Sequence, residues 1–144
     1  MKTIALILLP FVSFIATAQK GPIYTTNDGA IKGYDPVAYF NQGEPIKGNE
    51  SFTYKWKEAD WHFSSQENLE AFKADPKKYA PQFGGYCAYG VSKGSLYKID
   101  PDAWKIVEGK LYLNYSKGIQ NKWEADRDAL IKKAEENWPG VVKE

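Results

Sequence analysis

The sequence is poor in the residues that hold metals and form disulfides. Its 144 residues contain one cysteine (Cys87), one histidine (His62) and one methionine (Met1). A lone cysteine cannot form an internal disulfide, so the fold depends on its apolar core. A structural zinc site needs four nitrogen or sulfur ligands and a catalytic one needs three protein ligands. Cys87 and His62 would therefore need carboxylates or a second chain, and a methionine-rich copper(I) site is excluded.

The sequence also lacks an excess of either charge. It has 19 basic and 18 acidic residues, and Arg127 is the only arginine. A net charge of +1 gives no electrostatic reason to bind nucleic acid or an anionic membrane. With one arginine, the chain has few side chains that could bind a phosphate through two parallel hydrogen bonds. The expected partner is therefore a metal ion or a small ligand, and the oligomeric state stays open.

Only one long hydrophobic run is present, and it lies at the N-terminus. Lys2 precedes an apolar stretch over residues 4–15, which ends in the small residues Ala16-Thr17-Ala18. This order is typical of a secretory signal peptide, here residues 1–18. The run is too short to span a bilayer comfortably, and no second one follows. We expect an exported protein, periplasmic or secreted, without a stable membrane span.

Aromatic residues, in contrast, are abundant: five tryptophans, ten tyrosines and seven phenylalanines. Such rings bury large areas and can build the core of a small domain. The second half is especially rich, with Tyr86, Tyr89, Tyr97, Trp104, Tyr112 and Tyr115. Such residues are more often buried in the core than placed in a binding site. A subset beside Cys87 would also suit a pocket for a small apolar or planar ligand.

The patterns predict one α+β domain over residues 34–144, after an extended N-terminal segment at 19–33. Asp35 and Pro36 predict a short helical turn through 37–40. Two β-hairpins are expected. The first pairs 51–56 with 61–63 across the linker 57–60, and the second pairs 103–107 with 110–115 across Glu108-Gly109.

Two longer helices complete the prediction. Ser64 and Glu67 form a capping-box pattern before a middle helix at 65–74. Apolar residues spaced by fours and sevens predict a long amphipathic C-terminal helix over 117–138, ended by Pro139-Gly140. No internal repeat and no low-complexity tract is evident.

Part of this pattern resembles a known family. "YDPVAYF" (34–40) and "FTYKWKEADWHFSSQENLEAFKADPKKYA" (52–80) are similar to the YHS domain, a small module related to the TRASH-type metal-binding domains. The resemblance covers an aromatic strand pair, Phe63-Ser64-Ser65, a helix with Leu69 and Phe72, and Asp-Pro-x-x-Tyr at 75–79. The remaining sequence, including "GGYCAYGVS", is similar to longer, exported members of the family.

The resemblance implies a metal site that this chain has altered. Metal-binding members of the family place cysteines where this sequence has Ala38, Ser64 and Asn68. Alanine cannot ligate, and a neutral hydroxyl or amide is a poor ligand for a soft metal. We therefore expect the inherited metal site to be lost and the fold to be retained.

Cys87 keeps three alternatives open. It is a buried structural residue, a soft-metal ligand, or a reactive or intermolecular thiol. His62 lies in a predicted strand between two aromatic residues, so it faces solvent or a pocket. A copper(I) site of Cys87 with His62, or with a second chain, is the metal hypothesis. The alternative is an aromatic-pocket or interaction module in which Cys87 is structural.

Catalysis is not expected from this sequence. Cys87 with His62 could form a nucleophile and base, but no nucleophile elbow, phosphate loop or dinucleotide fingerprint accompanies them. The sequence therefore predicts an exported, non-enzymatic binding module.

Overall fold

The structure is a computed structural model that describes residues 3, 5, 7, 10 and 20–142. The predicted signal peptide lies almost entirely outside these residues and stays a prediction. Among the described residues, no helix has both the length and the apolar character needed to cross a membrane.

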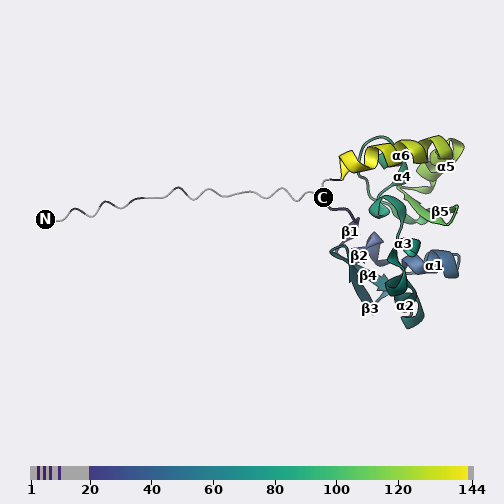
Figure 1. Cartoon of the computed structure of the whole chain (residues 1–144), viewed down its shortest axis with the longest axis horizontal. Helices are drawn as coiled ribbons and strands as arrows, with labels where there is room; N and C mark the ends of the chain where they lie inside the picture. The colour runs from purple at the N-terminus through teal and green to yellow at the C-terminus, as the bar shows by residue number, and fades with distance from the viewer. Residues whose placement is uncertain (1–2, 4, 6, 8–9, 11–19, 143–144) are drawn as a thin grey trace.

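The chain folds as α+β, as predicted, with its helices and strands in two lobes (Figure 1). The first lobe contains β1 (Thr25–Thr26), β2 (Gly29–Ala30), the short 3-10 helix η1 (Ile31–Gly33), α1 (Pro36–Asn41), β3 (Asn49–Trp56), β4 (Ala59–Phe63), α2 (Gln66–Ala74) and α3 (Pro76–Tyr79). A second 3-10 helix, η2 (Gln82–Gly85), leads to the second lobe. This lobe contains α4 (Ala88–Ser92), β5 (Asp100–Val107), β6 (Lys110–Asn114), α5 (Lys117–Ala125) and α6 (Arg127–Val141).

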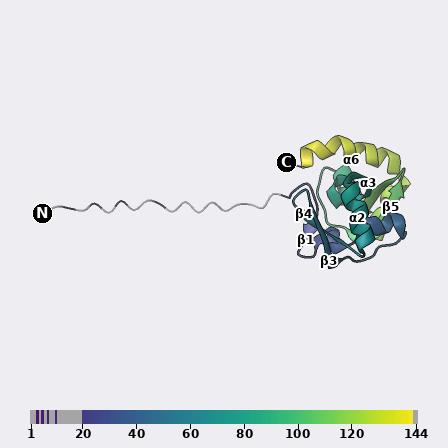
Figure 2. The ribbon, with the colours of Figure 1, turned by 60° about the horizontal axis from the view of Figure 1, so that its bottom comes forward.

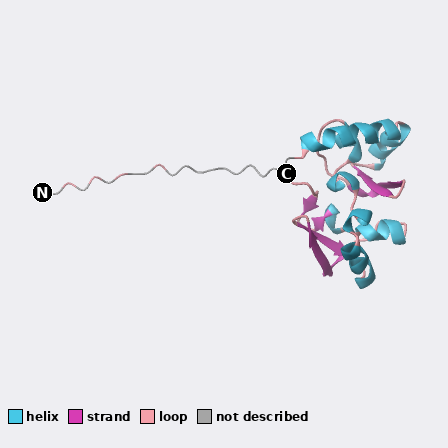
Figure 3. Ribbon diagram, in the orientation of Figure 1, coloured by secondary structure: helices cyan, strands magenta, loops and turns pink. Residues whose placement is uncertain are grey.

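The strands form three separate two-stranded antiparallel sheets within the described residues (Figure 3). Both predicted hairpins are present. The first is tighter than predicted, because Lys57 and Glu58 adopt φ of 50° and 61° and close a two-residue turn. Such left-handed pairs match the twist of the flanking strands. The small β1–β2 pair belongs to the segment expected to be an extended arm. Ile23, Ala30 and Ile31 are buried there, so that segment is part of the core.

The aromatic residues fill two core clusters. The larger is centred on Trp61, Phe63 and Phe72, whose rings pack at centroid distances of 5.1–5.3 Å. The smaller lies under α6 and contains Phe83, Tyr112, Trp123 and Ala134. Figure 2 shows α6 lying across one side of the molecule, over the second lobe.

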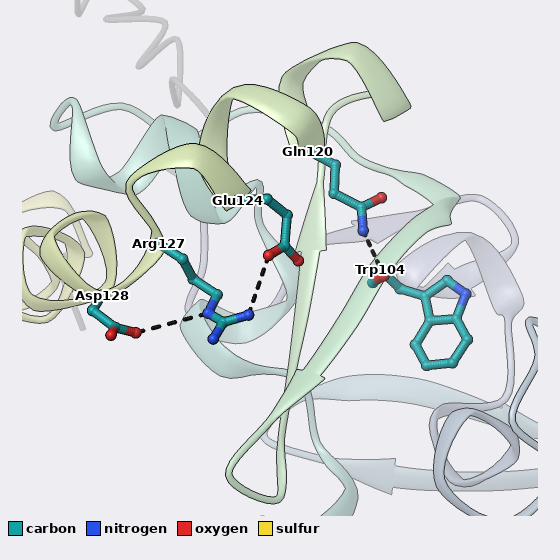
Figure 4. A network of polar contacts seen from close by, with 5 residues as sticks. All are labelled: Trp104, Gln120, Glu124, Arg127 and Asp128. Atoms are coloured by element: carbon teal, nitrogen blue, oxygen red, sulfur yellow. Dashed lines mark hydrogen bonds and ion pairs between the residues drawn. The ribbon is translucent and has the colours of Figure 1, made fainter.

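The C-terminal helix differs from its prediction. It is broken at Asp126, whose φ of −141° lies outside the helical range, and this gives α5 and α6. Arg127 contacts Glu124 across the break and Asp128 beside it in α6. The Gln120 amide donates to the Trp104 carbonyl (Figure 4). Trp123 and Ala134, both fully buried, are about three helical turns apart. The apolar spacing therefore continues through the break and did not reveal it.

The two ends predicted for helices also need correction. Pro139 does not stop α6, which runs on to Val141. Proline there removes only one hydrogen bond in the last turn. The middle helix is capped by Ser65, whose Oγ accepts from Asn68 N at 3.1 Å. Ser64, which the capping-box pattern suggested, makes a different contact that is described below.

Candidate functional site

The Cys87 sulfur is a structural junction. Cys87 is the N-cap of α4, and its Sγ accepts hydrogen bonds from Gly90 N at 3.4 Å and from Tyr115 N at 3.2 Å. The thiol donates to the Asn114 Oδ1 at 3.7 Å. The sulfur therefore ties the start of α4 to the end of β6.

The environment keeps this thiol protonated. Its exposed fraction is 1%. Burial raises the pKa of the Cys87 thiol above its usual range, and the backbone hydrogen bonds from Gly90, Tyr115 and Tyr89 offset this only in part. The thiolate is the form that attacks electrophiles and binds metals. Both roles are therefore disfavoured, and the buried, structural alternative agrees with the geometry.

An apolar groove lies beside Cys87. Its volume is about 610 Å³, within the usual range for small-molecule sites. Its lining residues are Cys87, Tyr89, Gly90, Lys93, Tyr97, Tyr115, Ser116 and Ile119. Tyr97 and Tyr115 are 51% and 43% exposed, and their rings meet edge to face at 6.4 Å. The groove is thus lined by two accessible aromatic rings and by a buried cysteine.

The charge at this groove has one sign. Of its lining residues, Lys93 alone carries a charge, and its Nζ lies 5.2 Å from the Tyr89 ring centroid. Lys98 lies nearby, with its Nζ 5.6 Å from the Tyr115 ring centroid. Two ammonium groups held over tyrosine rings favour a ligand with a negative group.

Asn114 forms hydrogen bonds with two residues that line the groove, Cys87 and Tyr89. Its side chain is fully buried, and its Oδ1 accepts from Tyr89 N at 3.1 Å as well as from the Cys87 thiol. Its Nδ2 has no hydrogen-bond partner among the described residues. An unpaired buried donor of this kind costs about 1–3 kcal/mol.

His62 belongs to a different part of the molecule. Its Nδ1 lies 2.8 Å from the Thr53 Oγ1, and its ring packs against Gly29, where an added Cβ would lie 2.7 Å from Nε2. It lines a polar hollow of about 460 Å³ in the first lobe. That hollow shares no lining residue with the Cys87 groove. The structure does not bring Cys87 and His62 together as ligands or as a nucleophile and base.

The three positions to which the resemblance assigns cysteines, Ala38, Ser64 and Asn68, converge on Asp35. Its Oδ2 accepts from Ser64 N at 2.8 Å, Ser64 Oγ at 2.7 Å and Asn68 Nδ2 at 2.8 Å. Its Oδ1 accepts from Val37 N at 2.8 Å and Ala38 N at 3.2 Å, which caps α1. The carboxylate is fully buried. We call Asp35, Ala38, Ser64 and Asn68 the Asp35 cluster.

The Asp35 cluster does not fit a soft metal ion. Five donors already point their hydrogens at the two carboxylate oxygens, and Ala38 offers no ligand atom. Hydroxyl, amide and carboxylate groups also lack the softness that copper(I) prefers. Elsewhere in the described part of the chain, no three His, Cys, Asp or Glu side chains are grouped in a way that could hold a metal.

Sequence reasoning found Asp35 only as a helix cap. The missed signal is the pair Ser64 and Asn68, two short donors one helical turn apart, which replace thiolates and need a shared acceptor. The aromatic residues of the second half were expected to lie in the core or to line a pocket, and both occur. Tyr86 and Tyr112 are buried in the core, whereas Tyr89, Tyr97 and Tyr115 line the groove.

Comparison with known proteins agrees with the resemblance. The family model of the YHS domain matches residues 37–83, about a third of the chain. No curated protein and no solved structure matches the chain. The matched segment runs from α1 to η2 and includes Ala38, Ser64 and Asn68 of the Asp35 cluster. Residues 37–83 are therefore similar to a YHS domain, and the comparisons assign no family to the rest of the chain.

Proposed function

We propose that this protein is an exported, non-enzymatic binding module that holds a small planar ligand with a negative group in the groove beside Cys87. The observation that carries the proposal is the pair of exposed rings, Tyr97 and Tyr115, on the rim of an apolar groove of about 610 Å³. Exposed large apolar side chains that gather around one hollow are typical of binding surfaces.

The lining favours a planar body. Tyr97 and Tyr115 present faces and edges on which an aromatic ring can stack or pack edge to face, a contact worth about 0.5–1.5 kcal/mol beyond buried area. Ile119 adds an aliphatic surface at the start of α5. A flat ligand could thus cover both tyrosines.

Lys93 favours an acidic substituent on that ligand. An exposed ion pair contributes about 0.2–1 kcal/mol, which corresponds to a decrease in Kd of roughly 1.4- to fivefold. The charge therefore sets selectivity, and the rings supply most of the affinity.

The experiment uses one naphthalene scaffold that carries a carboxylate, a hydroxymethyl or an aminomethyl group at the same ring position. Each is titrated into ¹⁵N-labelled protein without the predicted signal peptide (residues 19–144), and amide shifts are followed by NMR. The carboxylate should bind most tightly, with shift changes at Gly90, Tyr97, Tyr115 and Ser116. Lys93→Ala should weaken the preference for the carboxylate, with Lys98 supplying the remainder. Lys55→Ala, which changes an exposed lysine on β3, should leave the preference unchanged. Absence of shift changes around the groove at millimolar ligand would disprove the proposal.

Metal binding is the other function that a YHS domain suggests, and copper(I) binding by Cys87 stays a prediction. The geometry gives it little support, because the sulfur already takes part in three hydrogen bonds and His62 is elsewhere. Calorimetric titration of the reduced protein with copper(I), wild type against Cys87→Ser, decides it. Tight binding that the substitution abolishes would support copper, and equal weak binding by both would remove it.

A further inference from the structure

The second hairpin repeats the dimensions of the first. Strands of eight and five residues are followed by a nine-residue helix in both β3–β4–α2 and β5–β6–α5. Both hairpins close with two residues of positive φ, 50° and 61° at Lys57-Glu58 and 51° and 77° at Glu108-Gly109. Both ladders also shift register near the start of the first strand.

The helices that follow begin and end alike. Ser65 caps α2 and Ser116 caps α5, each with its Oγ accepting from the backbone N–H three residues later at 3.1 Å. The helices end at Asp75 and Asp126, both of which leave the helical range. Each residue of the second segment lies 51 positions after its counterpart.

The correspondence extends to the segment before each hairpin. Ile31, Lys32 and Gly33 have φ of 45°, 58° and 78°, and Phe83, Gly84 and Gly85 have φ of 55°, 63° and 86°. Three consecutive left-handed residues are unusual, because this conformation is costly for residues with a Cβ. In both places a tyrosine follows and then the N-cap of a short helix, Asp35 or Cys87.

Two long-range hydrogen bonds are also repeated. Ser64 N donates to the Asp35 carboxylate, and Tyr115 N donates to the Cys87 sulfur. Asp35 N donates to Ile46 O at 2.8 Å, and Cys87 N donates to Tyr97 O at 3.1 Å. The residue that accepts at each cap therefore has the same backbone partners in both halves.

We infer that the chain contains two copies of one structural unit, residues 31–75 and 83–126, and that the Cys87 groove is the second copy of the Asp35 cluster. The equivalent pairs are Asp35 and Cys87, Ala38 and Gly90, Ser64 and Tyr115, and Asn68 and Ile119. All four second-unit members line the groove. This inference departs from the expectation of no internal repeat. Few of the equivalent residues are identical in sequence, so the sequence pattern gave no sign of it.

The two copies differ in what fills this position. In the first unit, Asn68 is 4% exposed and reaches the Asp35 carboxylate together with the Ser64 hydroxyl. In the second unit, Tyr115 is 43% exposed and Ile119 is half-buried at the rim. The first copy is closed by its own side chains, and the second copy is left open for a ligand. Only this last step rests on the proposed function.

Rebuilding the first-unit cluster in the second unit tests the equivalence. Cys87→Asp alone places a carboxylate where only backbone donors face it, so the melting temperature should fall. Adding Tyr115→Ser and Ile119→Asn supplies the two missing donors and should recover at least half of that fall. Tyr115→Ser with Ile119→Asn on the Cys87 background is the matched control and should not stabilise the protein. Thermal unfolding followed by tryptophan fluorescence measures all four proteins, including wild type.

Each outcome of this four-protein comparison supports or overturns the equivalence of the Cys87 groove and the Asp35 cluster. Recovery in the triple variant supports it, and so does a folded triple variant if Cys87→Asp alone does not fold. Additive losses of stability, or failure of both Cys87→Asp and the triple variant to fold, would overturn it.

The naphthalene carboxylate provides a separate test of ligand binding. The triple variant should bind it at least tenfold more weakly than wild type. If wild type binds no probe, the proposed function fails while the stability cycle still judges the repeat. If the triple variant is stable and binds as wild type does, the open copy is not the ligand site.

Discussion

Replacing Asp35 with asparagine should strongly destabilise the protein, because one carboxylate holds α1, β4 and α2 together. In Asp35→Asn, the remaining oxygen can keep capping α1, and the new NH₂ group then faces the donors that Oδ2 accepted from. Those are Ser64 N, the Ser64 hydroxyl and the Asn68 amide, at 2.7–2.8 Å. The Ser64 hydroxyl can rotate and accept, and Asn68 keeps one N–H on the Gln42 Oε1 at 3.0 Å. Ser64 N and the second Asn68 N–H lose their acceptor.

Each unpaired buried donor costs about 1–3 kcal/mol, so the two together lower the free energy of unfolding by about 2–6 kcal/mol. Against a total stability of roughly 5–15 kcal/mol, this is a large loss, and the melting temperature should fall by roughly 10–20 °C. Urea unfolding followed by tryptophan fluorescence measures it, since Trp61 and Trp123 are fully buried.

Asp60→Asn is the matched control. Asp60 is exposed on β4 and opposite Lys55, so its substitution should change stability by less than about 0.5 kcal/mol. A loss below about 1 kcal/mol in Asp35→Asn would refute the view that the Asp35 cluster is a structural centre. If wild type binds zinc or copper(I) and Asp35→Asn does not, the conclusion that the cluster does not fit a metal would be refuted.

The other predictions concern the second unit. Cys87 should react with dithionitrobenzoate far more slowly in the native protein than in urea. Because burial raises the pKa of the folded thiol, the unfolded chain loses its proton first, and stability should fall as pH rises above about 8.5. Cys87→Ala should lessen that alkaline loss in urea titrations. Gly90→Ala places a Cβ 2.6 Å from the Tyr97 ring and 3.2 Å from the Ser95 carbonyl oxygen. The ring must move, so naphthalene carboxylate binding should weaken severalfold; unchanged affinity in the folded variant would argue against the groove. Ser65→Ala and Ser116→Ala should each cost about 1 kcal/mol, and a large difference between them would count against the repeat.

Local patterns predicted most of the secondary structure. Asp35-Pro36 indicated α1, the alternation of aromatic residues indicated β3 and β4, and Glu108-Gly109 indicated the second hairpin turn. The errors came from backbone conformations that side-chain patterns do not encode. Lys57-Glu58 close a left-handed turn without glycine, and Asp126 breaks a helix whose apolar spacing continues.

The candidate site was only partly accessible from sequence. Loss of the thiolates at Ala38, Ser64 and Asn68 could be predicted from the resemblance, and the burial of Cys87 was one of three open alternatives. The hydrogen bonds of Ser64 and Asn68 to the Asp35 carboxylate could not be predicted, because Asp35 lies about thirty residues away from both in the chain. The repeat was hidden for a related reason. It is conserved in φ angles, caps and backbone hydrogen bonds, which very different side chains can satisfy.

The most direct measurement of the central claim is a crystal structure of the protein with the naphthalene carboxylate bound. The account predicts electron density for the ring in the groove against Tyr97 and Tyr115, with the carboxylate toward Lys93 and the Cys87 sulfur still hydrogen-bonded to Gly90 and Tyr115. Density at another surface, or a groove that stays empty when the ligand is present well above its measured Kd, would contradict the account.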